Sequence, residues 1–269
     1  MPRISSVHPK KSTTVRFEMA LASPRAKSMV MMGAMIRGMD LLSPRLGARW
    51  SASGEPVLLV HGWEGRGSQL GGLALAIAAA GFQPITIDLP AHGSSKGAQT
   101  NLLEFAEAVR GMVKFLGGVA GIIAHSFGAA GTTVALREPL SVGRLVYLAP
   151  CEDFDHFPRV FGDWLGLSDH LGARMRHSVE RRLGVSMAEL RGSLLAPRMK
   201  APLLVVHDEG DVDVPWQDGK TYAAAWPDSR LMTTQGLGHR RILREAAVLS
   251  AVAAFFKESA SPRKRQGEI

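Results

Sequence analysis

Cysteine is nearly absent from this sequence, because Cys151 is the only one among 269 residues. A single cysteine cannot form an internal disulfide, a CxxC redox pair or a zinc site built from several thiolates. We therefore interpret Cys151 as a structural thiol. The absence of internal disulfides fits a reducing compartment, and we expect a cytoplasmic protein.

Long hydrophobic runs are also missing. The most apolar stretch, residues 72–82, is much shorter than the roughly 20 residues that a membrane-spanning helix requires. The first apolar patch, residues 29–36, lies far from the start and is followed by Arg37, so no signal peptide is evident. We expect neither a membrane span nor a secretion signal.

Acidic residues are fewer than basic ones, 24 against 32, which gives a net charge of +8. The excess lies at the two ends. Residues 1–50 carry nine basic side chains against Glu18 and Asp40, and residues 257–269 carry four against two. Because these basic residues are terminal and not interleaved with stacking aromatics, the pattern does not favour nucleic-acid binding. Solvated ends explain it more simply.

The basic N-terminal extension, residues 1–50, contains a predicted amphipathic helix rich in methionine. A Ser-Pro dipeptide at residues 23–24 is a helix start signal, and apolar residues recur every three or four positions from Met29 to Met39. Such a stripe usually packs against the body of a protein. The alternative is a helix that lies on an anionic membrane surface, aided by the basic residues around it.

Downstream, short apolar runs alternate with helical patterns, which predicts a mostly parallel central sheet with helices on both faces. The expected strands are residues 57–60, 85–88, 121–124, 145–149, 203–207 and 231–234, and the expected helices are residues 70–80, 102–116, 127–138, 216–225 and 241–256. Residues 151–200 interrupt the alternation with short helices separated by glycines. We predict a core of residues 51–150 and 201–258, a helical cap of residues 151–200 and a disordered tail of residues 259–269.

Ser126 directly follows a predicted buried strand and precedes a helix that begins with small residues. So sharp a turn from strand to helix requires small residues two positions before and two after the serine, and here they are Ala124 and Gly128. A serine on such a turn is a candidate nucleophile. An ordinary loop serine remains the alternative, because the five-residue pattern alone is weak.

Candidate partners follow in the chain order Ser, Asp, His. Asp211 lies in an acidic loop after the strand at residues 203–207, and His239 lies between the last strand and the last helix. Asp208 and Asp213 are alternatives to Asp211, the first as a loop or capping residue and the second as a turn residue. A calcium-binding loop is disfavoured because the spacing does not match an EF-hand. For His239 the alternative is a surface histidine between glycines.

Together these segments resemble the α/β-hydrolase superfamily, over residues 55–258. The serine segment resembles its nucleophile elbow, with Ala124 where glycine is usual. Residues 88–95, D-L-P-A-H-G-S-S, resemble its D-x-P-G-H-G-x-S segment, with Ala91 in place of a glycine, and the acidic loop resembles G-x-x-D-x-x-V-P. The resemblance implies an α/β-hydrolase fold with a small helical cap.

The resemblance also implies a site and an activity. Ser126 would be the nucleophile, His239 the general base and Asp211 the acid, and the main-chain N–H groups of Trp63 and Phe127 would form the oxyanion hole. The expected reaction is cleavage of a carboxylic ester or thioester of a small molecule through an acyl-enzyme, without a metal or cofactor. Alternatives are an acyltransferase or perhydrolase with the same triad, and a non-catalytic ligand-binding member of the fold.

Aromatic residues of the predicted cap suggest that the substrate carries an apolar acyl or aryl group. They are Phe154, Phe157, Phe161 and Trp164. An equally simple interpretation is that these side chains only anchor the cap to the core.

Overall fold

The computed structural model describes residues 45–49, 54–153, 166 and 168–258. Seven strands form one sheet in the order β1-β3-β2-β4-β5-β6-β7. β1 pairs antiparallel with β3, and every other pair is parallel, which confirms the predicted mostly parallel sheet. The strands are β1 (Arg45–Arg49), β2 (Pro56–Val60), β3 (Gln83–Asp88), β4 (Val119–His125), β5 (Val142–Leu148), β6 (Leu203–Asp208) and β7 (Ser229–Thr234).

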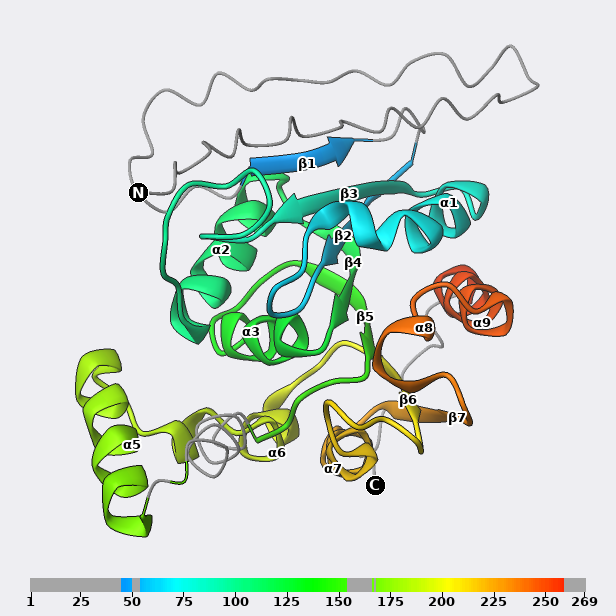
Figure 1. Ribbon diagram of the computed structural model, residues 1–269. Coiled ribbons are helices and arrows are strands. Elements are labelled where there is room, and N and C mark those ends of the chain that lie inside the picture. The colour runs from blue at the N-terminus through cyan, green and yellow to red at the C-terminus, as the bar shows by residue number, and fades with distance from the viewer. Residues whose placement is uncertain (1–44, 50–53, 154–165, 167, 259–269) are drawn as a thin grey trace, which may run out of the picture.

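Helices cover both faces of the sheet (Figure 1). The longer ones are α1 (Gly71–Ala79), α2 (Leu102–Phe115), α3 (Phe127–Ala135), α5 (Asp169–Leu183), α7 (Trp216–Ala225) and α9 (Ala246–Lys257), and the shorter ones are η1 (Gly67–Leu70), η2 (Met187–Leu190), α6 (Gly192–Leu195), η3 (Ala196–Arg198) and α8 (Gly238–Arg241). Asn101 begins α2 with a side-chain cap, accepting hydrogen bonds from the N–H groups of Leu103 and Glu104. This alternation of strands and helices is the α/β-hydrolase arrangement that the sequence predicts.

The strands divide the apolar core into two clusters, one on each face of the sheet. Along β2, Leu58 and Val60 belong to the cluster under α2, α3 and α7, whereas Val57 and Leu59 belong to the cluster under α1 and α9. All four side chains are at most 1% exposed. The reason is that successive side chains of a strand point to opposite faces, so a strand covered on both sides is apolar throughout.

Two features differ from the predicted elements. Arg45–Arg49 forms the edge strand β1, although the sequence predicts no strand there. The helix expected over residues 241–256 is divided, because α8 ends at Arg241 and α9 begins at Ala246. The predicted methionine-rich helix of residues 29–39 and the C-terminal tail lie outside the described residues.

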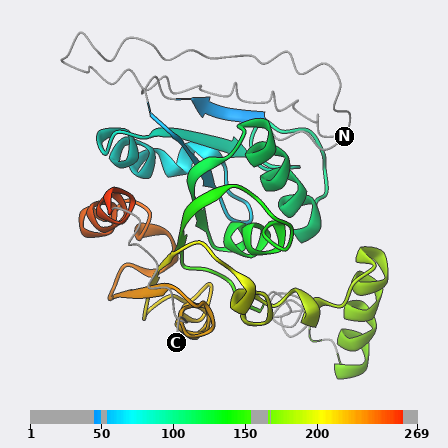
Figure 2. The same ribbon diagram turned by 180° about the vertical axis from the view of Figure 1, so that it is seen from behind.

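In the described part of the segment between β5 and β6, the helices α5, η2, α6 and η3 are joined by turns and irregular stretches. The longest helix, α5, has no buried residue and stands apart from the sheet in both views of the molecule (Figures 1 and 2). No helix in the described part of the chain is both long and apolar enough to span a membrane.

Candidate active site

Ser126 occupies the sharp turn between β4 and α3. Its φ of 53° and ψ of −124° lie in a region that residues with side chains rarely adopt, and its side chain is nearly buried. A Cβ atom on Gly128 would lie 2.3 Å from the main-chain oxygen of His61, so only glycine fits there. The backbone strain at Ser126 is thus held in place by a tightly packed turn.

The loop after β2 passes directly over this turn. A Cβ atom on Gly62 would lie 2.9 Å from Cβ of Ser126 and 3.2 Å from Nδ1 of His125. His61 fixes the loop on its other side, since its Nδ1 donates to the carbonyl of Gly62 and its Nε2 accepts from the N–H of Leu89. Trp63 thus directly follows the residue that lies against Ser126.

Asp211 and His239 are in direct contact. Nδ1 of His239 lies 2.7 Å from Oδ2 of Asp211, and the Asp211 side chain is fully buried while that of His239 is 10% exposed. The other carboxylate oxygen, Oδ1, accepts hydrogen bonds from the N–H groups of Asp213 and Val214. Because Nδ1 of His239 is engaged with the carboxylate, Nε2 is the ring nitrogen left for a substrate or nucleophile.

The pKa of Asp211 is held well below its usual value. Burial by itself would raise it, but hydrogen bonds from His207 and His239 and from the N–H of Val214 outweigh that effect. Asp211 is therefore ionised at neutral pH. An ionised carboxylate next to an imidazole orients the ring and stabilises its protonated form.

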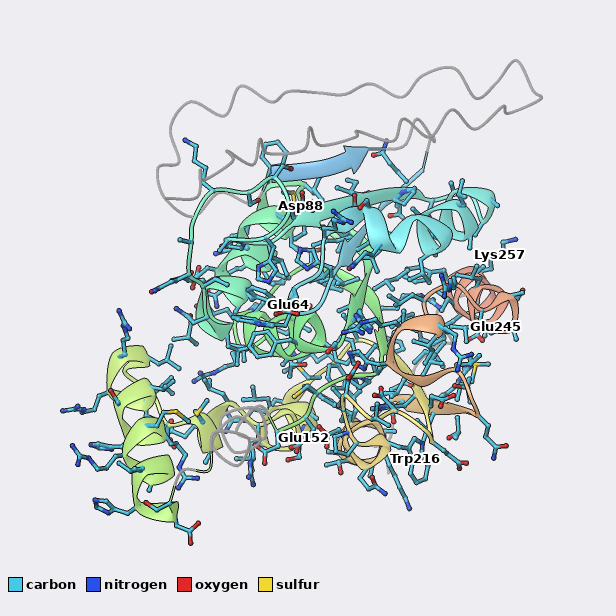
Figure 3. The ribbon with its side chains drawn as sticks, viewed as in Figure 1. Glu64, Asp88, Glu152, Trp216, Glu245 and Lys257 are labelled. Carbon is cyan, nitrogen blue, oxygen red and sulfur yellow. The ribbon has the colours of Figure 1, made fainter. Side chains whose placement is uncertain are left out.

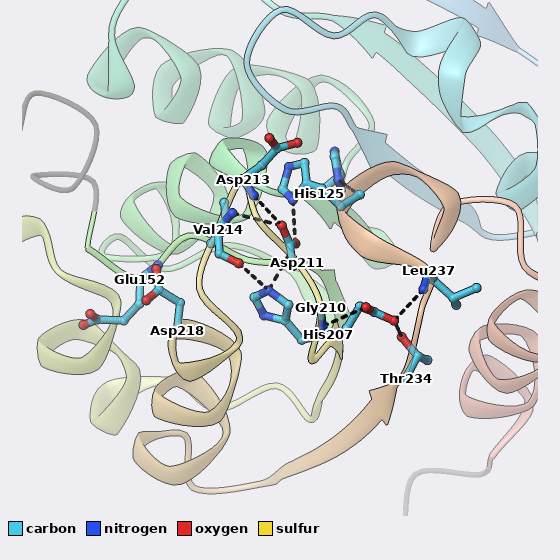
Figure 4. A network of polar contacts seen from close by, with 12 residues as sticks. His125, Glu152, His207, Gly210, Asp211, Asp213, Val214, Asp218, Thr234 and Leu237 are labelled. Atoms are coloured by element: carbon cyan, nitrogen blue, oxygen red, sulfur yellow. Dashed lines mark hydrogen bonds and ion pairs between the residues drawn. The ribbon is translucent and has the colours of Figure 1, made fainter. Parts of the chain in front are cut away.

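The sequence alternatives to Asp211 occupy different environments. Asp208, at the end of β6, is fully buried and binds the end of β7 and the loop after it, since its Oδ2 accepts hydrogen bonds from Thr234 and from the N–H of Leu237 (Figure 4). Asp213 is partly exposed and lies 3.8 Å from Arg240. Neither carboxylate is hydrogen-bonded to His239.

Two further histidines contact this arrangement, and no sequence pattern predicts a role for either toward His239 or Asp211. Nε2 of His207 lies 3.3 Å from Oδ2 of Asp211, and Nε2 of His125 lies 3.0 Å from the main-chain oxygen of His239. The rings of His125 and His239 are 4.6 Å apart between centroids. Their positions next to Ser126 and Asp208 in the sequence were the only available signal, because the contacts themselves are tertiary.

The described residues include no hydrogen-bond partner for the hydroxyl group of Ser126. Its neighbour His125 nevertheless contacts the ring and the backbone of His239, so the nucleophile and base candidates come from adjoining segments. Hydrogen bonds between a nucleophile and its base are often long without substrate and shorten when substrate binds. The site therefore consists of a hydrogen-bonded pair, Asp211 and His239, and a nearby serine on a strained turn.

Aromatic side chains surround the loop that contains Trp63. The Trp63 ring lies edge-on to Phe127 at 5.2 Å and stacks on Phe105 at 6.0 Å between centroids, and it is 49% exposed. A cavity of about 330 Å³ adjoins it, lined by residues 63–65, 91–93 and 98–100. The four cap aromatics expected to contact substrate, Phe154, Phe157, Phe161 and Trp164, lie outside the described residues.

Asp88, labelled in Figure 3, stabilises the loop that follows β3. Its carboxylate accepts hydrogen bonds from the N–H groups of Gly67 and Ser94 and from the Ser94 hydroxyl. Ala91 in this loop has a φ of +60°, the left-handed conformation that favours glycine. The alanine thus adopts the backbone of the glycine that stands at this position in the family pattern.

A model of the alpha/beta hydrolase family matches residues 57–252. This match covers most of the chain and contains Trp63, Ser126, Asp211 and His239. The protein belongs to the alpha/beta hydrolase family. The chain has no match among curated protein sequences.

Solved structures with the same fold carry different names. A putative non-heme bromoperoxidase, BpoC from Mycobacterium tuberculosis, superposes with a TM-score of 0.63 at 17% identity, covering 82% of this chain and 98% of its own. Est1E from Butyrivibrio proteoclasticus, with ferulic acid bound, gives 0.59 at 21%, covering 75% and 87%. A monoacylglycerol lipase from Paleococcus ferrophilus gives 0.60 at 20%, covering 78% and 96%. At these identities the likeness concerns the fold alone.

Proposed function

We propose that this protein is a serine hydrolase that cleaves a carboxylic ester or thioester of a small molecule through an acyl-enzyme. The observation that carries the proposal is the 2.7 Å contact between Nδ1 of His239 and Asp211, formed beside Ser126 on its strained turn. An imidazole held by a buried carboxylate, next to a serine on a strained turn, is the arrangement that activates a hydroxyl group.

In the proposed reaction, Nε2 of His239 removes the proton from Ser126 as Oγ attacks the carbonyl carbon. The tetrahedral oxyanion accepts hydrogen bonds from the N–H groups of Trp63 and Phe127, each of which stabilises it by about 3–4 kcal/mol. His239 then protonates the leaving alcohol or thiol. Water, deprotonated by the same histidine, attacks the acyl-enzyme and releases the carboxylic acid and free Ser126.

An apolar acyl or aryl group remains the proposed substrate portion. The half-exposed ring of Trp63 beside the oxyanion loop supports it, because an exposed aromatic face next to a nucleophile can cover such a group. Esters of ferulic acid and monoacylglycerols are suggested as test compounds by the names of two structural neighbours.

Hydrolysis of p-nitrophenyl esters with acyl chains of two to twelve carbons tests the proposal. We expect turnover by the wild type with a preferred chain length, and none by Ser126→Ala. A folded wild type that hydrolyses no ester or thioester in such a series would contradict it and favour the non-catalytic, ligand-binding alternative.

Transfer of the acyl group to an acceptor other than water is a second candidate, because neighbours named as bromoperoxidases share the fold. Adding hydrogen peroxide or a primary alcohol during ester turnover distinguishes the two. Formation of the peracid or the new ester at the expense of the free acid would identify a perhydrolase or an acyltransferase.

A further inference from the structure

His207 and His239 both lie close to Oδ2 of Asp211. His207 occupies the second-last position of β6 and is fully buried. Its Nε2 lies 3.3 Å from Oδ2 of Asp211 and 3.2 Å from the main-chain oxygen of Val214. Figure 4 shows His207 beneath Asp211 and Val214. Oδ2 is therefore within 3.3 Å of two imidazole nitrogens, one from His207 and one from His239.

The neighbours of His207 determine which of its nitrogens carries the proton. Both atoms that face Nε2, a carboxylate oxygen and a carbonyl oxygen, can only accept, so Nε2 must donate. Nδ1 is buried and has no hydrogen-bond partner among the described residues. A second proton on Nδ1 would lack an acceptor, and the geometry therefore favours a neutral ring that donates through Nε2.

α7 leaves room for this ring by means of a glycine. A Cβ atom on Gly219 would lie 2.4 Å from Nδ1 and 2.9 Å from Cβ of His207. Any side chain at position 219 would push the ring out of its place, so the helix and the histidine fit each other. The position of His207 is thus fixed from one side by α7 and from the other by the loop of Asp211.

We propose that His207 is a positioning residue for the triad acid of the hydrolase proposed above. Its Nε2–H lies between the carbonyl of Val214 at 3.2 Å and Oδ2 at 3.3 Å and is shared by them, while Oδ1 accepts hydrogen bonds from the N–H groups of Asp213 and Val214. The carboxylate then keeps one orientation, with Oδ2 directed to Nδ1 of His239. The expected effect of His207 on turnover rests on the proposed function. Its expected effect on the Asp211–His239 hydrogen bond does not.

Two substitutions separate the hydrogen bond from the volume of the ring. The amide nitrogen of glutamine can take the place of Nε2, so His207→Gln keeps the donor, whereas His207→Met fills a similar space without one. We expect His207→Met to slow ester hydrolysis by about tenfold through kcat, the effect of one lost hydrogen bond to a charged group. His207→Gln should retain most of the wild-type rate.

A proton NMR measurement tests the same point without turnover. The Nδ1–H proton of His239, assigned by its loss in His239→Ala, should change its chemical shift in His207→Met and stay near the wild-type value in His207→Gln. In an Asp211→Ala background, His207→Met should cause no further slowing. Tyr222→Phe, which removes a buried hydroxyl of α7 that contacts Thr133, is the control for loss of stability alone.

The outcomes are distinguishable. A wild type without esterase activity contradicts the proposed function, while the NMR comparison still decides the role of His207. Folded His207→Met protein with the wild-type kcat and an unchanged His239 resonance would overturn the inference. So would a loss in His207→Met that persists undiminished in the Asp211→Ala background.

Discussion

Nε2 of His125 donates a hydrogen bond to the main-chain oxygen of His239, with 3.0 Å between the two atoms. This bond joins the last residue of β4, the neighbour of Ser126, to the segment that carries the proposed general base. Burial lowers the pKa of His125 to about 3, so the ring remains a neutral donor at ordinary pH. The segments of the proposed nucleophile and the proposed base are thereby joined through a residue that stays neutral at ordinary pH.

Stability should fall as the pH is lowered from about 6.5 toward 4. The pKa of His125 is about 3 and that of His61 is lowered by burial to about 4, against an ordinary value of 6.5. In this window the unfolded chain binds protons that the folded chain does not, so acid favours unfolding. Each histidine contributes about 1.4 kcal/mol per pH unit.

Urea unfolding at intervals between pH 4.5 and 7.5 measures this slope, and a variant with His125→Gln should show a smaller slope below pH 6. A free energy of unfolding that stays constant from pH 7 down to 5 would show that the two buried rings become protonated in the folded protein.

Gly128→Ala should damage the turn at Ser126. The new Cβ atom would lie 2.3 Å from the oxygen of His61, and we expect a loss of about 1–3 kcal/mol in the free energy of unfolding together with slower reaction of the serine. Gly111→Ala in α2 is the matched control, because nothing lies within 4 Å of its Cβ position and alanine favours a helix by about 0.5–1 kcal/mol. Equal effects of the two substitutions on stability would be inconsistent with the close approach at Gly128.

The loop after β3 offers a pair of opposite substitutions. Gly93 has a φ of +54°, and a Cβ atom there would lie 2.3 Å from the carboxylate of Asp88, so Gly93→Ala should destabilise the fold by more than about 1 kcal/mol. Ala91→Gly, by contrast, removes left-handed strain and should leave stability unchanged or raise it by up to about 1 kcal/mol. Thermal melting of both variants is the measurement, and a stabilised Gly93→Ala would refute the loop geometry.

Asparagine substitutions should rank the three acidic residues of the β6 loop. Asp211→Asn is expected to slow turnover by about 10⁴-fold, because an amide N–H would face Nδ1 of His239 and favour the wrong tautomer. Asp208→Asn should cost about 1–3 kcal/mol of stability, since an amide nitrogen cannot accept from Leu237 and Thr234. Asp213→Asn should have little effect, as its ion pair with Arg240 is exposed.

Steady-state kinetics and urea unfolding of the three variants decide this order. If Asp208→Asn or Asp213→Asn lost more turnover than Asp211→Asn while remaining folded, the assignment of the acid would be wrong.

The buried strands could be predicted from the sequence because their patterns are local. β2 and the first four residues of β6 are continuous apolar runs, which a strand covered on both faces requires. β1 could not be predicted, because Arg45–Arg49 has few apolar residues and becomes a strand only by pairing with the edge of β3. The division between α8 and α9 could not be predicted either. Ile242 and Leu243 lie in the turn between the two helices and are both buried, so their apolar side chains continue the helical pattern.

The candidate site divides in the same way. Ser126, Asp211 and His239 follow strand ends in a known order, and that order predicts that their side chains meet at one edge of a parallel sheet. The roles of His125 and His207 depend on which atoms their rings face after folding, and no spacing in the sequence specifies that. A histidine at the end of a buried strand is compatible with a structural position and with a contact to a catalytic group alike.

Reaction with a fluorophosphonate, followed by intact mass, tests most directly whether Ser126 is an activated nucleophile. The wild type should gain the mass of one adduct, Ser126→Ala none, and His239→Ala one only at a strongly reduced rate. Unchanged labelling of Ser126→Ala, or no labelling of the folded wild type, would contradict the proposed triad.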